Sequence, residues 1–209
     1  MRGDRRAVQT VCGLPYRIKE RDRMRVLFIG NSHTYYNEMP RIFQEIAEKN
    51  GCRVDAAMIA HGGWYLKQHL EEKSQEAALS IRIGHYDYVV LQEHTHPFEE
   101  EDAYLNSVQK FCEMIRSTGA VPVIYATWAK KADPSPEEEM ERLQKKAADL
   151  TGALYAPVGE QWWKKMRAGE ADFFGPDGQH ANRSGSELAA GILWEVISSS
   201  AGQPERTDG

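Results

Sequence analysis

An apolar stretch near the start of the chain reads RVLFIG from Arg25 to Gly30 and continues into Asn31 and Ser32. β-branched and aromatic residues that end in a glycine are typical of a short buried strand. A serine directly after such a strand lies at its carboxyl end, where open α/β sheets bind their ligands. The stretch therefore predicts the first strand of a parallel sheet and a candidate reactive hydroxyl, that of Ser32.

The rest of the chain alternates short apolar runs with longer amphipathic segments. Further strands are expected at Arg53–Ile59, Tyr86–Leu91, Val121–Thr127 and Ala153–Ala156. Helices are expected at Pro40–Asn50, Leu66–Ser80, Glu99–Ser117, Pro134–Leu150, around Trp162, Trp163 and Met166, and at Asn182–Ser199. Strands that alternate with helices through right-handed crossovers predict a three-layer α/β/α sandwich with five parallel strands.

One of these helices has a recognisable start. Asp133 is expected to be its N-cap and Pro134 its first residue, a position that suits proline. The acidic run Glu137–Glu141 is interpreted as a solvated first turn, where negative charge is favourable.

The composition suits one globular domain. Hydrophobic residues make up 41% of the 209 residues and charged residues 27%, and the formal net charge of -5 argues against a nucleic-acid partner. No apolar run is long enough to span a membrane and no signal peptide is recognisable, so we expect a cytoplasmic protein without a membrane partner. The three cysteines lie far apart, which fits neither a metal site nor a disulfide framework.

We expect residues 24–199 to form the domain. Residues 1–23 are rich in arginine and are interpreted as a poorly ordered leader, with a basic docking arm as the alternative. Residues 200–209 are polar and are expected to fray. The sequence does not indicate the oligomeric state.

A second group of candidate residues lies in a Gly/Pro-rich loop near the C-terminus. Asp177 and His180 are three positions apart, which lets the carboxylate reach the imidazole Nδ1–H while Nε2 faces outward. That arrangement prepares an imidazole to take the proton of a serine. The alternatives are a turn or helix cap at Asn31 and Ser32, and a capping aspartate beside an exposed histidine.

Together, the blocks Gly30-Asn31-Ser32 and Asp177-Gly178-Gln179-His180 resemble those of the SGNH, or GDSL-like, hydrolases. The blocks stand in the family's order, and the resemblance runs from about Met24 to about Ser199. It implies a flavodoxin-like sandwich and carboxylic ester hydrolysis through an acyl-enzyme, without a metal or organic cofactor. The expected substrate is a small-molecule or carbohydrate ester, and O-acetyl groups on carbohydrates are one such class.

The resemblance also assigns roles to the residues. Ser32 is the expected nucleophile, His180 the general base and Asp177 the partner that orients it. An acyltransferase on the same three residues, in which an acceptor hydroxyl replaces water, is one alternative. A carbohydrate-binding pseudoenzyme is another.

An oxyanion hole assembled from three segments is implied as well. The expected backbone donors are the N–H groups of Ser32 and of Gly63, with Gly62 close behind; a simple loop hinge is the alternative reading of the two glycines. The family's third block, Gly-x-Asn-Asp, is absent, and this departure is the only support for a pseudoenzyme. Gln92 is the expected third donor and His94 the runner-up.

Four residues are weaker candidates for the substrate pocket because they follow the nucleophile or predicted strand ends: His33, Trp64, His94 and Trp128. Packing in the core or on its rim is the alternative for the aromatic ones. A zinc site with ligands from His94, His96, His61 or His180 is an alternative for the histidines, but no known ligand spacing supports it, so no metal is expected.

Overall fold

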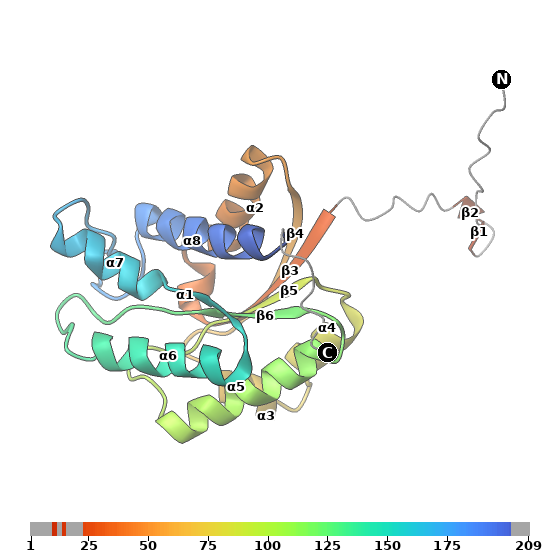
Figure 1. The fold of residues 1–209 in the computed structure, drawn as a ribbon, viewed down its shortest axis with the longest axis horizontal. Helices are drawn as coiled ribbons and strands as arrows, with labels where there is room; N and C mark the ends of the chain where they lie inside the picture. Colours follow the sequence, from red (N-terminus) through yellow and green to blue (C-terminus); the bar gives the residue numbers. More distant parts are fainter. Residues whose placement is uncertain (1–9, 12–13, 16–22, 202–209) are drawn as a thin grey trace.

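Five parallel strands form the centre of the protein (Figure 1). The computed structural model describes residues 10–11, 14–15 and 23–201. The strands are β3 (Arg23–Gly30), β4 (Arg53–Ala60), β5 (Tyr88–Leu91), β6 (Val121–Tyr125) and β7 (Leu154–Ala156). Their order in the sheet is β4-β3-β5-β6-β7, which is the flavodoxin-like order and confirms the predicted fold class. A separate antiparallel pair is formed by β1 (Thr10–Val11) and β2 (Leu14–Pro15).

The register of the sheet brings three strand ends to one edge. β3 pairs with β4 up to Gly30 opposite Ala60, and with β5 up to Ile29 opposite Leu91. Because the strands are parallel, the segments that follow β3, β4 and β5 all leave the sheet at this edge.

Helices cover both faces of the sheet (Figure 1). One face carries α1 (Ser32–Tyr35), the 3₁₀ turn η1 (Tyr36–Glu38), α2 (Met39–Lys49), α7 (Val158–Arg167) and α8 (Arg183–Ala201). The other carries α3 (Leu66–Glu71), α4 (Glu76–Ile83), α5 (Glu101–Arg116) and α6 (Glu137–Thr151).

Strand β3 has apolar side chains on both of its faces, which is why helices pack on both faces of the sheet. Val26 and Phe28 enter the core below α2 and α8, whereas Leu27 and Ile29 enter the core against α4 and α5, and all four are fully buried. A continuous apolar run is typical of a parallel strand that is buried on both sides. Each such side chain contributes about 1.5–3 kcal/mol through its burial.

Two predicted helices differ from the structure. The segment Leu66–Ser80 forms two helices, because Gln75 adopts a left-handed φ of 55° and Glu72 accepts hydrogen bonds from the backbone and hydroxyl of Ser74. These local bonds compete with continued helix.

The helix expected from Pro134 begins at Glu137 instead. The carboxylate of Asp133 accepts hydrogen bonds from the Ser135 N–H and hydroxyl, so it forms a turn before the helix rather than its N-cap. Glu137 is also buried, and its carboxylate accepts the N–H of Ala129. The first turn of α6 is thus not fully solvated.

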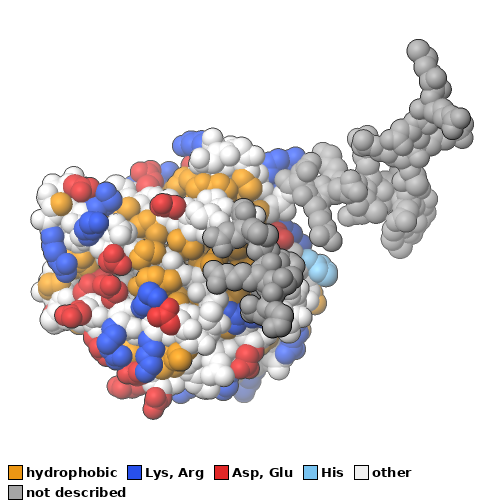
Figure 2. Space-filling model, in the orientation of Figure 1, with side chains coloured by type: hydrophobic (Ala, Val, Ile, Leu, Met, Phe, Trp, Pro, Cys, Tyr) orange, Lys and Arg blue, Asp and Glu red, His pale blue; other side chains and the backbone are white. Residues whose placement is uncertain are grey.

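Most residues of the predicted leader, 1–23, and of the predicted tail, 200–209, lie outside the described residues. Of those that are described, Arg23 is the first residue of β3, and Ala201 is the last residue of α8. None of the described helices is both long and apolar enough to cross a membrane. On the face shown in Figure 2, acidic and basic side chains are interspersed.

Candidate active site

Ser32 lies at the first position of α1, directly after β3. The side chain of Asn31 caps this helix, because its Oδ1 accepts the N–H of His33 at 3.1 Å. Its Nδ2 donates to the carbonyl of Trp64 at 2.9 Å and ties the serine turn to the segment after β4. Asn31 is therefore the helix cap that the sequence offered as an alternative, and the cap leaves the Ser32 hydroxyl at the sheet edge.

The loop that carries His180 is a closed turn before α8. The Gly175 N–H donates to the His180 carbonyl at 2.7 Å, and Gly178 takes a left-handed φ of 66°, which glycine adopts without strain. Two bonds anchor the turn to the segment after β6. The Lys131 N–H donates to the Gly178 carbonyl, and the Trp128 indole donates to the Gln179 carbonyl, each at 2.9 Å.

These two segments bring Ser32, His180 and Asp177 together. His180 Nε2 lies 2.7 Å from Ser32 Oγ, and His180 Nδ1 lies 2.6 Å from Asp177 Oδ2. With Nδ1–H donating to the carboxylate, Nε2 is free to accept the serine proton. Chemically, the arrangement can activate a hydroxyl for attack on an acyl carbon.

Asp177 is held in its charged form. Partial burial opposes ionisation, but the hydrogen bonds from the His180 ring and from the N–H groups of Gln179 and His180 outweigh it and lower the pKa of Asp177 to about 2. Asp177 is therefore a carboxylate throughout the neutral range. It also caps its own loop, as the alternative interpretation expected.

His33 lies behind the imidazole of His180 rather than on an open pocket wall. Its ring is buried, stacks on His180 with centroids 5.0 Å apart, and shares a 2.9 Å hydrogen bond with the Thr95 hydroxyl. Burial, followed by repulsion from His180, His96 and His94, lowers the pKa of His33 well below its usual value. His33 is thus neutral beside the reactive residues.

Gln92 does not face the space in front of Ser32, which corrects its predicted role. It is fully buried, and its Oε1 accepts the Asn31 N–H at 2.8 Å and the Thr34 hydroxyl at 2.9 Å. Its Nε2 donates to the Glu93 carbonyl. The amide oxygen braces the serine turn, and because the whole side chain is buried, it does not reach the open space in front of Ser32.

His94, the runner-up for the same role, uses one ring nitrogen within the protein. Its Nδ1 lies 2.8 Å from the carbonyl of Pro97, so Nδ1 carries a proton and donates to that oxygen. Its ring packs against Tyr65, with centroids 4.5 Å apart.

The glycine pair follows β4 and lies beside the turn that carries Ser32. His61 N–H donates to the carbonyl of Gly30, which places Gly62 and Gly63 beside the serine turn. Among the described residues, neither glycine N–H has a protein acceptor. Gly63 has a φ of 73°, and a Cβ at Gly62 would lie 3.1 Å from the Tyr35 hydroxyl, so both positions favour glycine.

The two predicted pocket tryptophans have different surroundings. Trp128 is fully buried and stacks on Trp162 at 3.8 Å, so its role in lining a cleft is wrong. It acts instead through its bond to the His180 loop. Trp64 is partly exposed, and its ring lies 4.2 Å from that of His61.

Three supporting residues were missed. His69 Nε2 hydrogen-bonds the Gly30 carbonyl at 2.9 Å, Thr34 donates to Gln92, and Thr95 holds His33. Each comes from a different segment of the chain. No sequence signal marks them, because their partners are distant in the chain.

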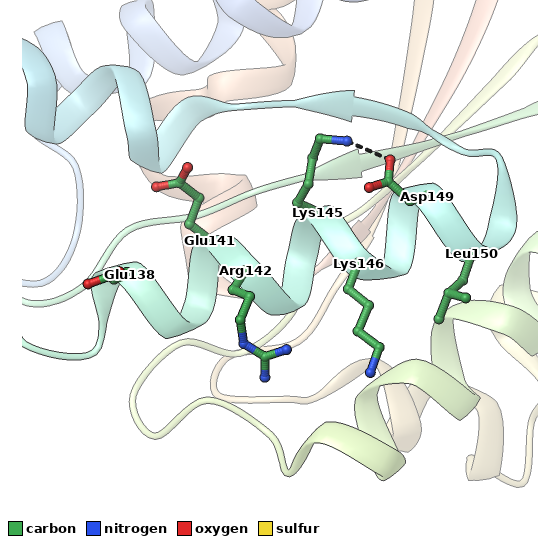
Figure 3. Close-up of a pocket in the computed structure, with 7 residues that line it drawn as sticks. All are labelled: Glu138, Glu141, Arg142, Lys145, Lys146, Asp149 and Leu150. Carbon is green, nitrogen blue, oxygen red and sulfur yellow. Dashed lines mark hydrogen bonds and ion pairs between the residues drawn. The ribbon is translucent and has the colours of Figure 1, made fainter.

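No group of three or more His, Cys, Asp or Glu side chains among the described residues could hold a metal ion. A surface hollow lies elsewhere, along α6 (Figure 3). Its lining includes charged side chains such as Lys145 and Asp149, which pair with each other, and it contains none of the residues above. The hollow is therefore separate from the site around Ser32 and His180.

Comparison with known proteins finds a solved structure of substantial sequence identity. No family model and no curated protein matches the sequence. The solved structure of a protein from Slackia heliotrinireducens that is classed with the SGNH hydrolases is 35% identical, with a TM-score of 0.70; the match covers 83% of this chain and 98% of that one.

Two more distant structures share the fold. A DUF4886 family protein from Bacteroides uniformis is 20% identical with a TM-score of 0.67, and the match covers 90% of this chain and 88% of that one. A catalytic mutant of an acetylxylan esterase from Geobacillus stearothermophilus is 11% identical with a TM-score of 0.65, and the match covers 83% and 94% of the two chains.

Proposed function

The chain belongs to the SGNH hydrolase family, and from this premise we propose that it is a serine esterase that cleaves carboxylic esters through an acyl-enzyme. The observation that carries the proposal is the continuous hydrogen-bonded relay from Ser32 Oγ through His180 to Asp177, at 2.7 and 2.6 Å. A complete relay favours an active enzyme over a pseudoenzyme.

The proposed reaction has two halves. Ser32 Oγ attacks the ester carbonyl while His180 takes its proton, and the alcohol then leaves with that proton. His180 next takes a proton from water, whose oxygen attacks the acyl carbon; the bond to Ser32 Oγ then breaks, His180 returns the proton to Oγ, and the acid leaves. Asp177 stabilises the imidazolium in both halves.

Two backbone donors are proposed for the oxyanion, the N–H groups of Ser32 and Gly63. Ser32 N–H opens α1 and Gly63 N–H follows β4, so both leave the same sheet edge. Since Gln92 is committed elsewhere, we propose that the hole relies on backbone donors rather than a side-chain amide. Backbone donors are preorganised, so they cost little reorganisation during the reaction.

The proposed substrate class is a small-molecule or carbohydrate ester, with O-acetyl groups on sugars as one case. Tyr35 is exposed at the end of the short helix that begins at Ser32, and Trp64 is partly exposed on the neighbouring segment. Aromatic faces suit the apolar faces of sugar rings. The fold shared with an acetylxylan esterase is compatible with this substrate class. A cytoplasmic location stays a prediction from the sequence.

The test is hydrolysis of a chromogenic acetyl ester by the protein and its Ser32→Ala variant. We expect the variant to lose nearly all activity, and a fluorophosphonate to label Ser32, as mapped by mass spectrometry. Ser198→Ala, near the end of α8, is the matched control and should keep the full rate. Equal rates for the unaltered protein and Ser32→Ala, or a label on another residue, would overturn the proposal.

A further inference from the structure

Tyr36 lies flat on the imidazole of His180. The two ring centroids are 4.0 Å apart and the planes differ by 6°. His33 stacks on the same imidazole at 5.0 Å and 27°. The imidazole of His180 therefore contacts two aromatic rings, and no stacking of Tyr36 on His33 is found among the described residues.

A strained turn holds Tyr36 in this place. Asn37 and Glu38 follow it with left-handed φ values of 52° and 57°, which non-glycine residues rarely adopt. The Asn37 amide donates to the Ala181 carbonyl and to the Ser186 hydroxyl, each at 2.9 Å. Ala181 directly follows His180, so the turn that carries Tyr36 is tied to the loop that carries the imidazole. Strain of this kind persists where surrounding bonds enforce it.

His33, the second ring that contacts the His180 imidazole, is also held in place. His33 is buried, hydrogen-bonded to Thr95, and packed edge-on against Trp128 at 5.2 Å. Because burial lowers the pKa of His33, and burial together with Lys130 lowers that of His96 to about 4, neither adds positive charge beside His180. Asp177 is then the charged group that faces the imidazole directly.

We propose that Tyr36 is a positioning residue for His180, whose imidazole it clamps against His33 in the plane that reaches both Ser32 and Asp177. This inference rests on the proposed function. Flat contact restricts rotation of the imidazole out of that plane. The electron-rich face of Tyr36 also attracts the ring once it is protonated, so the clamp favours the imidazolium that forms during the reaction.

Two substitutions separate the ring of Tyr36 from its hydroxyl. Tyr36→Phe keeps the aromatic face, whereas Tyr36→Leu removes it. Because Tyr36 is 38% exposed, neither change opens a core cavity. Circular dichroism and thermal melting of both variants establish that they are folded.

The first readout is the rate at which a fluorophosphonate labels Ser32. We expect Tyr36→Leu to label about tenfold more slowly and Tyr36→Phe to stay within about twofold of the unaltered protein. The second readout is the proton resonance of the His180 Nδ1–H that bonds Asp177. It should remain sharp in Tyr36→Phe and broaden in Tyr36→Leu.

The two readouts define the outcomes that would contradict the proposed role of Tyr36. Unchanged labelling and an unchanged resonance in Tyr36→Leu overturn the clamp, and so does a Tyr36→Phe variant that loses as much as Tyr36→Leu. If the unaltered protein is not labelled at all, the proposed function fails instead, and the resonance alone then decides whether Tyr36 positions the ring.

Discussion

Replacing Gln92 by methionine tests whether this residue supports the fold or the reaction. Methionine has a similar volume and fits the buried site, so little strain is added. The substitution removes the oxygen that accepts the Asn31 N–H and the Thr34 hydroxyl. Both groups come from the turn that carries Ser32.

The expected loss of stability follows from the two donors that would no longer have an acceptor. A buried N–H without a partner costs about 1–3 kcal/mol, and the Thr34 hydroxyl adds about 1 kcal/mol. We therefore expect the free energy of unfolding to fall by about 2–4 kcal/mol. With an m value of about 3 kcal/mol per molar urea, the urea midpoint falls by about 1 M.

Urea unfolding followed by circular dichroism measures this loss, and ester hydrolysis of the folded variant is measured beside it. Gln109→Met, on the exposed side of α5, is the matched control and should change stability by less than about 0.5 kcal/mol. The reasoning is refuted if Gln92→Met keeps its stability while its rate falls a hundredfold, because that pattern belongs to a lost oxyanion donor.

Three further changes have defined outcomes. Asp177→Asn should lower kcat by about 10³- to 10⁴-fold in the acetyl ester assay, because the amide no longer selects the Nδ1–H tautomer of His180; a variant that keeps a tenth of the rate contradicts this. Burial raises the pKa of Glu93 to about 8, above its ordinary 4.5. The protonated side chain therefore makes its full contribution to the free energy of unfolding below pH 4.5, and this contribution is lost as the pH rises through 8. Glu93→Gln should then melt at a higher temperature than the unaltered protein at pH 8.5 but not at pH 4.5, and a difference that is constant with pH would rule this out. Trp128→Phe should lower kcat more than it raises KM, since it removes the indole bond to the Gln179 carbonyl and loosens the His180 loop; steady-state kinetics distinguish this from a change in KM alone, which would indicate substrate contact.

The order of strands and helices could be predicted because each strand is an apolar run bounded by turn residues. RVLFIG at Arg25–Gly30 is such a run, and the observed strand is longer only by the polar Arg23 and by Met24. The split between α3 and α4 was missed because side-chain bonds at Glu72 end the first helix without a proline or glycine.

The candidate site was only partly predictable. Ser32, Asp177 and His180 stand in short blocks whose chemistry is local, so their identity and spacing suffice to propose them. Gln92 was misassigned because an amide after a strand can donate to a ligand or brace a turn, and its neighbours decide which. Those neighbours, Asn31 and Thr34, are about 60 positions away in sequence.

The Ser32 hydroxyl and the His180 imidazole are separated by 148 positions along the chain. They meet only when β3, at one end of the domain, and the turn before α8, at the other, are both docked on the sheet. No fragment that lacks either end can hold the pair, and release of α8 alone would part them. Reactivity at Ser32 should consequently report the intact native state, so its decay during denaturation traces cooperative unfolding of the whole sandwich.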